Sequence, residues 1–242
     1  MKKIILILIV VVIFIIYLIT MDRKVYYLTL GDELSISNYD NEDINYSYKL
    51  KDYLDNKNKL EVFVNGFSKE NNRITDVINN INNNVKVNYE GKDISIQNAL
   101  IKADLLTLSI GMNDIISRIN IKTVNSSDSY DFLYDDIDEI VNDLDEMMHL
   151  VRQYCKEKII IIGLYYPFKE QNQELLNIFL YANNKFRDIS EKYNIKYIDV
   201  YNQFLENDNY LSSTNVLYPS KDGYNAIYDQ VIIVINNTIK NS

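Results

Sequence analysis

The chain is 242 residues long and 47% hydrophobic, which is enough to bury one sizeable core. Its formal net charge of -9 at pH 7 repels phosphate backbones and argues against nucleic acid as a partner. The single cysteine, Cys155, excludes an internal disulfide and a multi-cysteine metal site, and two prolines and six glycines form no interdomain linker. We therefore expect one folded domain, residues 23–242, after a short N-terminal segment.

The N-terminal segment has the pattern of a membrane anchor. Lys2 and Lys3 precede an unbroken apolar run, Ile4–Ile19, and charged residues follow from Asp22. The run lies near the roughly 17 residues that span a bilayer and exceeds the usual core of a signal peptide. We interpret residues 1–22 as an uncleaved, single-pass signal anchor, with the N-terminus in the cytoplasm and the domain outside the cell. The alternatives are secretion after signal cleavage and a buried core helix.

Beyond this segment, short apolar runs alternate with longer amphipathic ones, which is typical of a parallel sheet covered by helices on both faces. Expected strands are Val25–Leu30, Leu60–Asn65, Leu105–Ile110, Lys158–Gly163 and Lys196–Val200, with a small extra strand at Val85–Tyr89. Expected helices are Asn45–Lys57, Arg73–Asn82, Ser95–Ala103, Asp131–Cys155, Gln171–Tyr193 and Gly223–Ile239. The pattern predicts a flavodoxin-like three-layer α/β/α sandwich with a five-stranded parallel sheet.

Distinctive motifs fall where the carboxyl ends of the predicted strands and their loops meet, the edge at which such sheets bind ligands. The motifs are Gly31-Asp32-Glu33, Asn65-Gly66, Gly111-Met112-Asn113-Asp114 and Asn215-Val216-Leu217-Tyr218-Pro219. Together they resemble the motif blocks of the SGNH/GDSL hydrolases, over nearly all of the chain after Lys24. The resemblance implies the SGNH hydrolase fold and an esterase or lipase that acts on acyl esters of lipids or glycans.

When the family's functional residues are matched to this sequence one by one, several positions carry a different residue type. The family's nucleophilic serine falls on Glu33, and its aspartate and histidine fall on Asn215 and Tyr218. The donors of its oxyanion hole fall on the backbone amides of Glu33 and Gly66 and on the side chain of Asn113. The catalytic positions therefore carry other chemistry, whereas the expected oxyanion donors are kept.

These departures remove the usual route to a nucleophile, because a hydroxyl attacks a carbonyl only when a base takes its proton. Tyr218, with an ordinary pKa of about 10, is a poor base at neutral pH, and Asn215 carries no charge. The sole histidine, His149, belongs to a helix whose end reaches the opposite edge of the sheet. We predict a catalytically inactive binding or scaffolding module; the alternative is an active hydrolase that uses the carboxylate of Glu33.

Glu33 admits three interpretations. Its carboxylate fills the oxyanion cluster and accepts a hydrogen bond from Tyr218, or it works as a nucleophile or base, or it is a solvated loop residue. Tyr165 and Tyr166 follow the fourth expected strand and are candidates to line the pocket, which is expected to hold a small acyl or glycan ligand.

Other polar residues near the first motif are assigned no catalytic role. Ser35 and Ser37 lack a nearby histidine and are interpreted as helix caps. Asp32 and Asp114 are expected to line the pocket and to form hydrogen bonds with its loops. Together with Glu33 they could suggest a site for a hard cation, but no further residues have the spacing of metal ligands. No cofactor is expected, and no feature of the sequence sets the oligomeric state.

Overall fold

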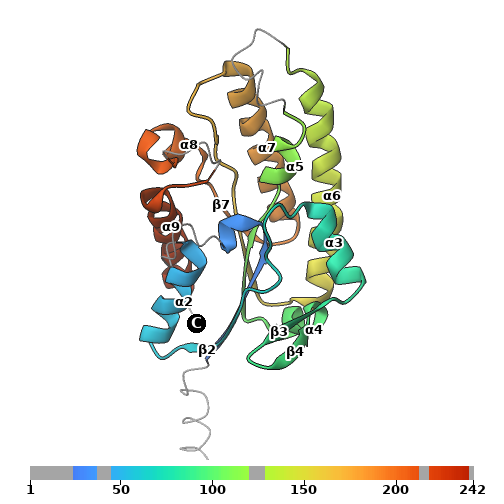
Figure 1. Cartoon of the computed structure of the whole chain (residues 1–242), viewed down its shortest axis with the longest axis vertical. Helices are drawn as coiled ribbons and strands as arrows, with labels where there is room; N and C mark the ends of the chain where they lie inside the picture. Colours follow the sequence, from blue (N-terminus) through green and yellow to red (C-terminus); the bar gives the residue numbers. More distant parts are fainter. Residues whose placement is uncertain (1–23, 37–44, 120–128, 213–217, 240–242) are drawn as a thin grey trace, which may run out of the picture.

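The computed structural model describes residues 24–36, 45–119, 129–212 and 218–239. A five-stranded sheet, in which each neighbouring pair is parallel, runs through the middle in the order β2-β1-β5-β6-β7. Its strands are β1 (Val25–Gly31), β2 (Leu60–Val64), β5 (Leu105–Ser109), β6 (Lys158–Ile162) and β7 (Lys196–Ile198). Helices cover both faces (Figure 1), so the predicted three-layer sandwich is confirmed.

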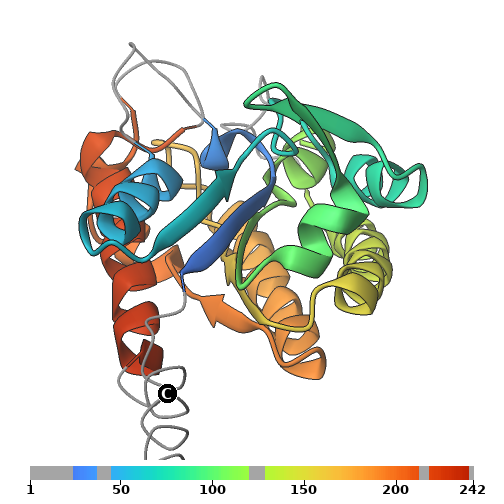
Figure 2. The same cartoon turned by 90° about the horizontal axis from the view of Figure 1, so that it is seen from below.

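Two groups of helices form the outer layers, and Figure 2 shows them on opposite sides of the strands. One group is α2 (Tyr46–Asn56), α8 (Tyr201–Leu205) and α9 (Lys221–Ile239). The other is α3 (Ile74–Asn82), α4 (Ile96–Lys102), α5 (Met112–Ile116), α6 (Phe132–Tyr154) and α7 (Gln173–Lys192). All the predicted helices are present, and their ends lie within about two residues of the predicted ones, which is the usual uncertainty of a helix boundary.

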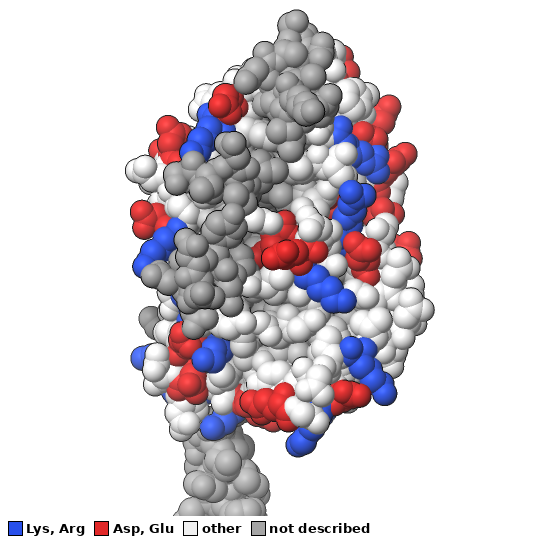
Figure 3. Space-filling view, viewed as in Figure 1, with Lys and Arg blue, Asp and Glu red and all other residues white. Residues whose placement is uncertain are grey.

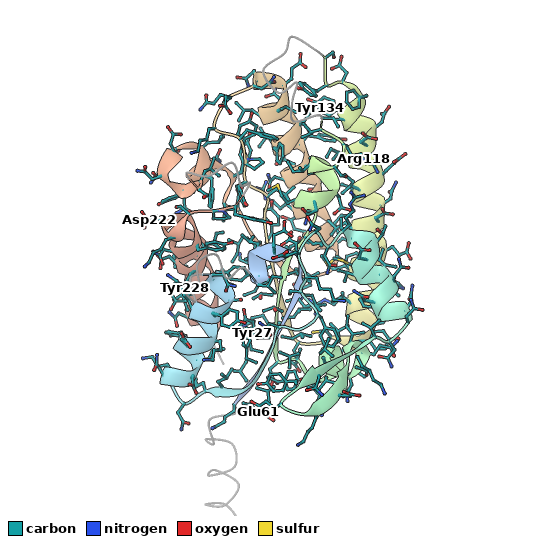
Figure 4. The ribbon with its side chains drawn as sticks, viewed as in Figure 1. Tyr27, Glu61, Arg118, Tyr134, Asp222 and Tyr228 are labelled. Atoms are coloured by element: carbon teal, nitrogen blue, oxygen red, sulfur yellow. The ribbon has the colours of Figure 1, made fainter. Side chains whose placement is uncertain are left out.

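Strand β1 shows how the sheet separates two hydrophobic cores. Tyr26, Leu28 and Leu30 pack into the core shared with α3, α4 and α6, because alternate residues of a strand face the same way. Tyr27 faces the other core, with α2 and α9, and Figure 4 shows it inside the molecule. Its hydroxyl lies 3.0 Å from the Thr107 hydroxyl, so both buried groups are satisfied. Burial on both faces explains why the central strands are unbroken apolar runs.

The structure also contains short elements that the sequence pattern does not predict. The extra strand expected at Val85–Tyr89 is β3 (Lys86–Tyr89), and it pairs antiparallel with an unpredicted strand, β4 (Lys92–Ser95). Strand β4 has the sequence Lys-Asp-Ile-Ser, so no apolar run marks it. Helices α5 and α8 have five residues each, which is too short to establish a helical period.

The acidic face of α6 pairs with cations of its neighbours. Arg118, which follows α5, lies 2.5 Å from Asp136, and Lys192 of α7 lies 2.6 Å from Asp145. Figure 4 places Arg118 beside α6, and acidic and basic side chains are interspersed over the face drawn in Figure 3. Exposed pairs of this kind contribute only about 0–1 kcal/mol each, so the two cores, not the surface charges, hold the layers together.

The predicted anchor, residues 1–22, and the domain boundary after it lie outside the described residues. Within the described residues, no helix is long and apolar enough to cross a membrane.

Candidate active site

Two glycines shape the turns that carry the site. Gly31 ends β1 with φ of +126° and Gly111 follows β5 with φ of +100°, a region that residues with a side chain rarely adopt. A Cβ at position 31 would lie 1.8 Å from the carbonyl oxygen of Ser109, and one at position 111 would lie 2.6 Å from the ring of Phe186. Only glycine fits either turn, and the turns place the next residues at the carboxyl edge of the sheet.

Glu33 lies directly after β1 in a single 3-10 turn, η1 (Glu33–Ser35), and is only 8% exposed. Its Oε2 accepts hydrogen bonds from Nδ2 of Asn113 and from the backbone amide of Asn71, both at 2.9 Å. The Asn113 side chain also donates to the carbonyl of Asn72 at 3.1 Å, which fixes its orientation. The carboxylate therefore lies within the donor cluster and is almost fully shielded from solvent.

Tyr218 completes the surroundings of this carboxylate. Burial, and after it the negative charge of Glu33, raise the pKa of Tyr218 to about 12, and the two side chains are hydrogen-bonded. A phenol with this pKa stays protonated at neutral pH, so it donates to the carboxylate and takes no proton from a nucleophile. Asn215, on which the resemblance places the family's aspartate, lies outside the described residues.

The backbone donor beside Asn113 is Asn71, which sequence reasoning missed. The predicted donor, Gly66, does not line the cavity, and a Cβ there would lie 3.2 Å from Cβ of Val87 in β3. Asn71 has φ of +58°, a left-handed conformation that asparagine tolerates better than most residues. The adjacent pair Asn71-Asn72 is the only sequence signal of this turn, and it is common in loops.

Two residues expected in the pocket wall have structural roles instead. Both carboxylate oxygens of Asp114 lie 3.3 Å from the amide nitrogen of Ile74, at the start of α3, and burial raises the pKa of Asp114 to about 6. Tyr166 belongs to the core on the α7 side, where its hydroxyl donates to the carbonyl of Glu170 at 2.9 Å and its ring meets Phe179 edge-on. Neither Asp114 nor Tyr166 lines the cavity.

The other two expected residues do line the cavity. Asp32 accepts a hydrogen bond from the amide of Leu34 at 3.1 Å. Burial raises the pKa of Asp32 well above its usual range, and repulsion by the neighbouring Glu33 adds to the shift. Tyr165 belongs to the opposite core from Tyr166 and stacks on Phe204, with the ring centroids 4.6 Å apart. The adjacent tyrosines are thus divided between the two faces of the sheet.

Ser35 is buried and structural. Its hydroxyl lies 2.8 Å from the hydroxyls of Tyr46 and Ser109, so it joins η1 to α2 and β5. Ser37, the other serine near this motif, lies outside the described residues. The exposed His149 lies near the C-terminal end of α6, hydrogen-bonded to Gln153 at 3.1 Å, and this end of the helix leads into the start of β6 at the opposite edge of the sheet.

A cavity of about 280 Å³ opens at the carboxyl edge beside these groups. Its polar and aromatic lining comprises Asp32, Glu33, Asn71, Ser109, Asn113, Tyr165 and Tyr218. The remaining wall is apolar or glycine, and no lysine, arginine or histidine of the described residues lines it. In the same part of the chain, no group of three or more His, Cys, Asp or Glu side chains is placed to hold a metal ion.

A model of the GDSL-like lipase/acylhydrolase family matches residues 29–226, and the chain belongs to this family. Solved structures share the fold at low identity. The acetylxylan esterase Axe2 of Geobacillus stearothermophilus is 16% identical, with a TM-score of 0.60 over 85% of this chain and 91% of that one. The lipase Lip_vut3 from a goat rumen metagenome is 17% identical, with a TM-score of 0.64 over 86% of this chain and 95% of that one.

The psychrotrophic esterase EstA of a Pseudoalteromonas species, solved in a form inhibited by monoethylphosphonate, is 13% identical, with a TM-score of 0.59 over 88% of this chain and 98% of that one. A search of curated proteins finds no match to this chain.

Proposed function

We propose that this chain is a catalytically inactive member of the GDSL family that acts as a binding or scaffolding module. One observation carries the proposal: the carboxylate of Glu33 accepts hydrogen bonds from Asn113 and Asn71, the donors that would otherwise receive an ester carbonyl. A carbonyl oxygen entering this cluster would meet a negative charge where the reaction needs to stabilise one. The site is therefore closed to the oxyanion of ester hydrolysis.

The proton chemistry supports the same proposal. Ester hydrolysis by this family's route needs a base within reach of a hydroxyl. Tyr218 is a protonated donor, and the nearest serine hydroxyl after Glu33, that of Ser35, is buried between Tyr46 and Ser109. His149 is at the wrong end of its helix to help.

Activity assays on the full chain test this proposal. We expect no hydrolysis of short p-nitrophenyl acyl esters above the buffer rate and no covalent labelling by a fluorophosphonate probe, with EstA as the positive control. Labelling of this chain would contradict the proposal. Turnover that disappears in E33Q would instead support the second candidate function, hydrolysis of acyl esters of lipids or glycans through Glu33, which the burial of this carboxylate beside a cavity favours.

We further propose that residues 1–22 anchor the protein in the cell membrane as a single-pass helix, with the domain on the outer side. The apolar run Ile4–Ile19 and the flanking lysines support this, and the domain begins almost directly afterwards, with β1 at Val25. Protease treatment of intact cells is expected to degrade the domain while the protein fractionates with membranes. Recovery of a soluble protein that begins near residue 20 would show a cleaved signal instead.

A further inference from the structure

The cavity beside Glu33 has the opposite charge from a site that stabilises an oxyanion. Asp32 and Glu33 are adjacent in sequence, 3% and 8% exposed, and both line it. In an ester hydrolase the donors at this edge face an incoming oxygen. Here Asn113 and Asn71 already donate to Glu33, so the groups left to meet a ligand are chiefly acceptors.

These carboxylates have no cation beside them in the described part of the chain. No described lysine or arginine forms an ion pair with Asp32 or Glu33, and none lines the cavity. Glu33 accepts hydrogen bonds from Asn113, Asn71 and Tyr218, and Asp32 is hydrogen-bonded to the Leu34 amide and the Ser109 side chain. A carboxylate offers about four acceptor sites, so each still has capacity for a further donor. Burial and the neighbouring Glu33 raise the pKa of Asp32, so a negative charge on both residues is unfavourable without a partner, and a cation from outside the chain would supply that partner.

The rest of the wall favours an organic cation over an inorganic one. Leu34, Ile110 and Met112 give it apolar surface, and Tyr165 and Tyr218 line it as well. Aromatic rings attract ammonium groups through cation–π contacts, and apolar walls bury an alkyl chain. No third acidic side chain stands with Asp32 and Glu33 in the lining, as a hard metal ion would require for a protein-built shell.

We infer that the cavity binds a small primary ammonium compound, whose N–H groups donate to the carboxylates of Asp32 and Glu33 while its alkyl part lies on the apolar wall. This inference rests on the proposed function, because it takes the donor cluster to be permanently filled by Glu33. A primary ammonium compound is then the class of ligand that the proposed binding module holds.

Isothermal titration calorimetry of the full chain in detergent micelles at pH 7 tests the inference with two probes of matched size, n-butylammonium and butyrate. We expect n-butylammonium to bind at least about tenfold more tightly than butyrate, because the two have similar alkyl chains but only the ammonium group is attracted by the carboxylates of the cavity. This comparison uses the wild-type protein and does not depend on the folding of any variant. Equal binding of both probes, or tighter binding of butyrate, would overturn the inference.

Two variants locate the binding. E33Q keeps the side-chain shape and is expected to weaken n-butylammonium binding by about tenfold or more. E61Q makes the same change of charge at an exposed residue of β2, at the lower end of the molecule in Figure 4, and is expected to bind like the wild type. Unchanged binding by E33Q, with circular dichroism like that of the wild type, would overturn the inference. Ester turnover by the wild type would overturn the proposed function instead, so the two failures are distinct.

Discussion

The triple variant E33S/N215D/Y218H is expected to hydrolyse short acyl esters at least about 100-fold faster than the parent chain, since a positioned general base alone contributes about 10²–10⁴-fold. The substitution at position 33 removes the carboxylate from Nδ2 of Asn113 and the amide of Asn71, which frees both donors for a carbonyl oxygen. The histidine and aspartate supply the base and its partner, which the family's mechanism requires. Gly31 and Gly111 already hold the two turns in place.

Release of p-nitrophenol and labelling by a fluorophosphonate, measured on the full chain, check this expectation. E33S alone is the matched control: it frees the same donors but has no base, so it is expected to stay near the parent rate. A triple variant that keeps the parent's circular dichroism and still hydrolyses nothing would show that the donors around Glu33 no longer have oxyanion geometry.

Replacing Gly31 by alanine is expected to cost about 3 kcal/mol or more of folding free energy, enough to unfold a marginally stable domain. Two effects add. The left-handed φ of +126° is strained for any residue with a Cβ, and that Cβ would lie 1.8 Å from the Ser109 carbonyl oxygen, inside the hydrogen-bonded pair β1–β5. Relief of this clash would separate the two central strands, because backbone cannot move aside as a side chain can.

Gly91 provides the control for this prediction. It also has a positive φ, +78°, but a Cβ there would meet nothing within 4 Å, so G91A carries the backbone strain without the clash and is expected to cost about 1–2 kcal/mol. Urea unfolding of the two variants, followed by circular dichroism, measures the difference. Equal losses in G31A and G91A would mean that the strands shift to admit the extra methyl group.

Much of the fold could be predicted because the sequence pattern is strong where burial is strong. The central strands β1, β5 and β6 are buried on both faces, so they stand out as apolar runs, and the long helices show a clear period. Strand β4 escaped prediction because a surface hairpin needs no apolar run. The position of Glu33 after β1 could also be predicted, because the motifs Gly31-Asp32-Glu33 and Gly111-Met112-Asn113-Asp114 identify the two turns in the sequence.

The details of the site depended on backbone conformation, which the sequence pattern does not report. Asn71 reaches Glu33 only because of a left-handed turn several residues beyond β2, whereas the glycine nearer to that strand, Gly66, faces the β3–β4 hairpin. The separation of Tyr165 and Tyr166 follows from the alternation of side chains along an extended segment, so a stricter use of that rule would have assigned them to opposite faces.

Under the proposed function, the position of the Glu33 side chain also affects how a descendant of this protein could become an active esterase. A single mutation to serine at position 33 would remove the acceptor that Nδ2 of Asn113 and the amide of Asn71 share. Nδ2 would still donate to the carbonyl of Asn72, whereas the loss of a partner for the Asn71 amide would cost about 1–3 kcal/mol. The mutation would bring no catalytic benefit until positions 215 and 218 had also changed. Under the proposed function, a stepwise return to activity would therefore lose stability before it gained catalysis, so the hydrogen bonds of Glu33 favour the present site.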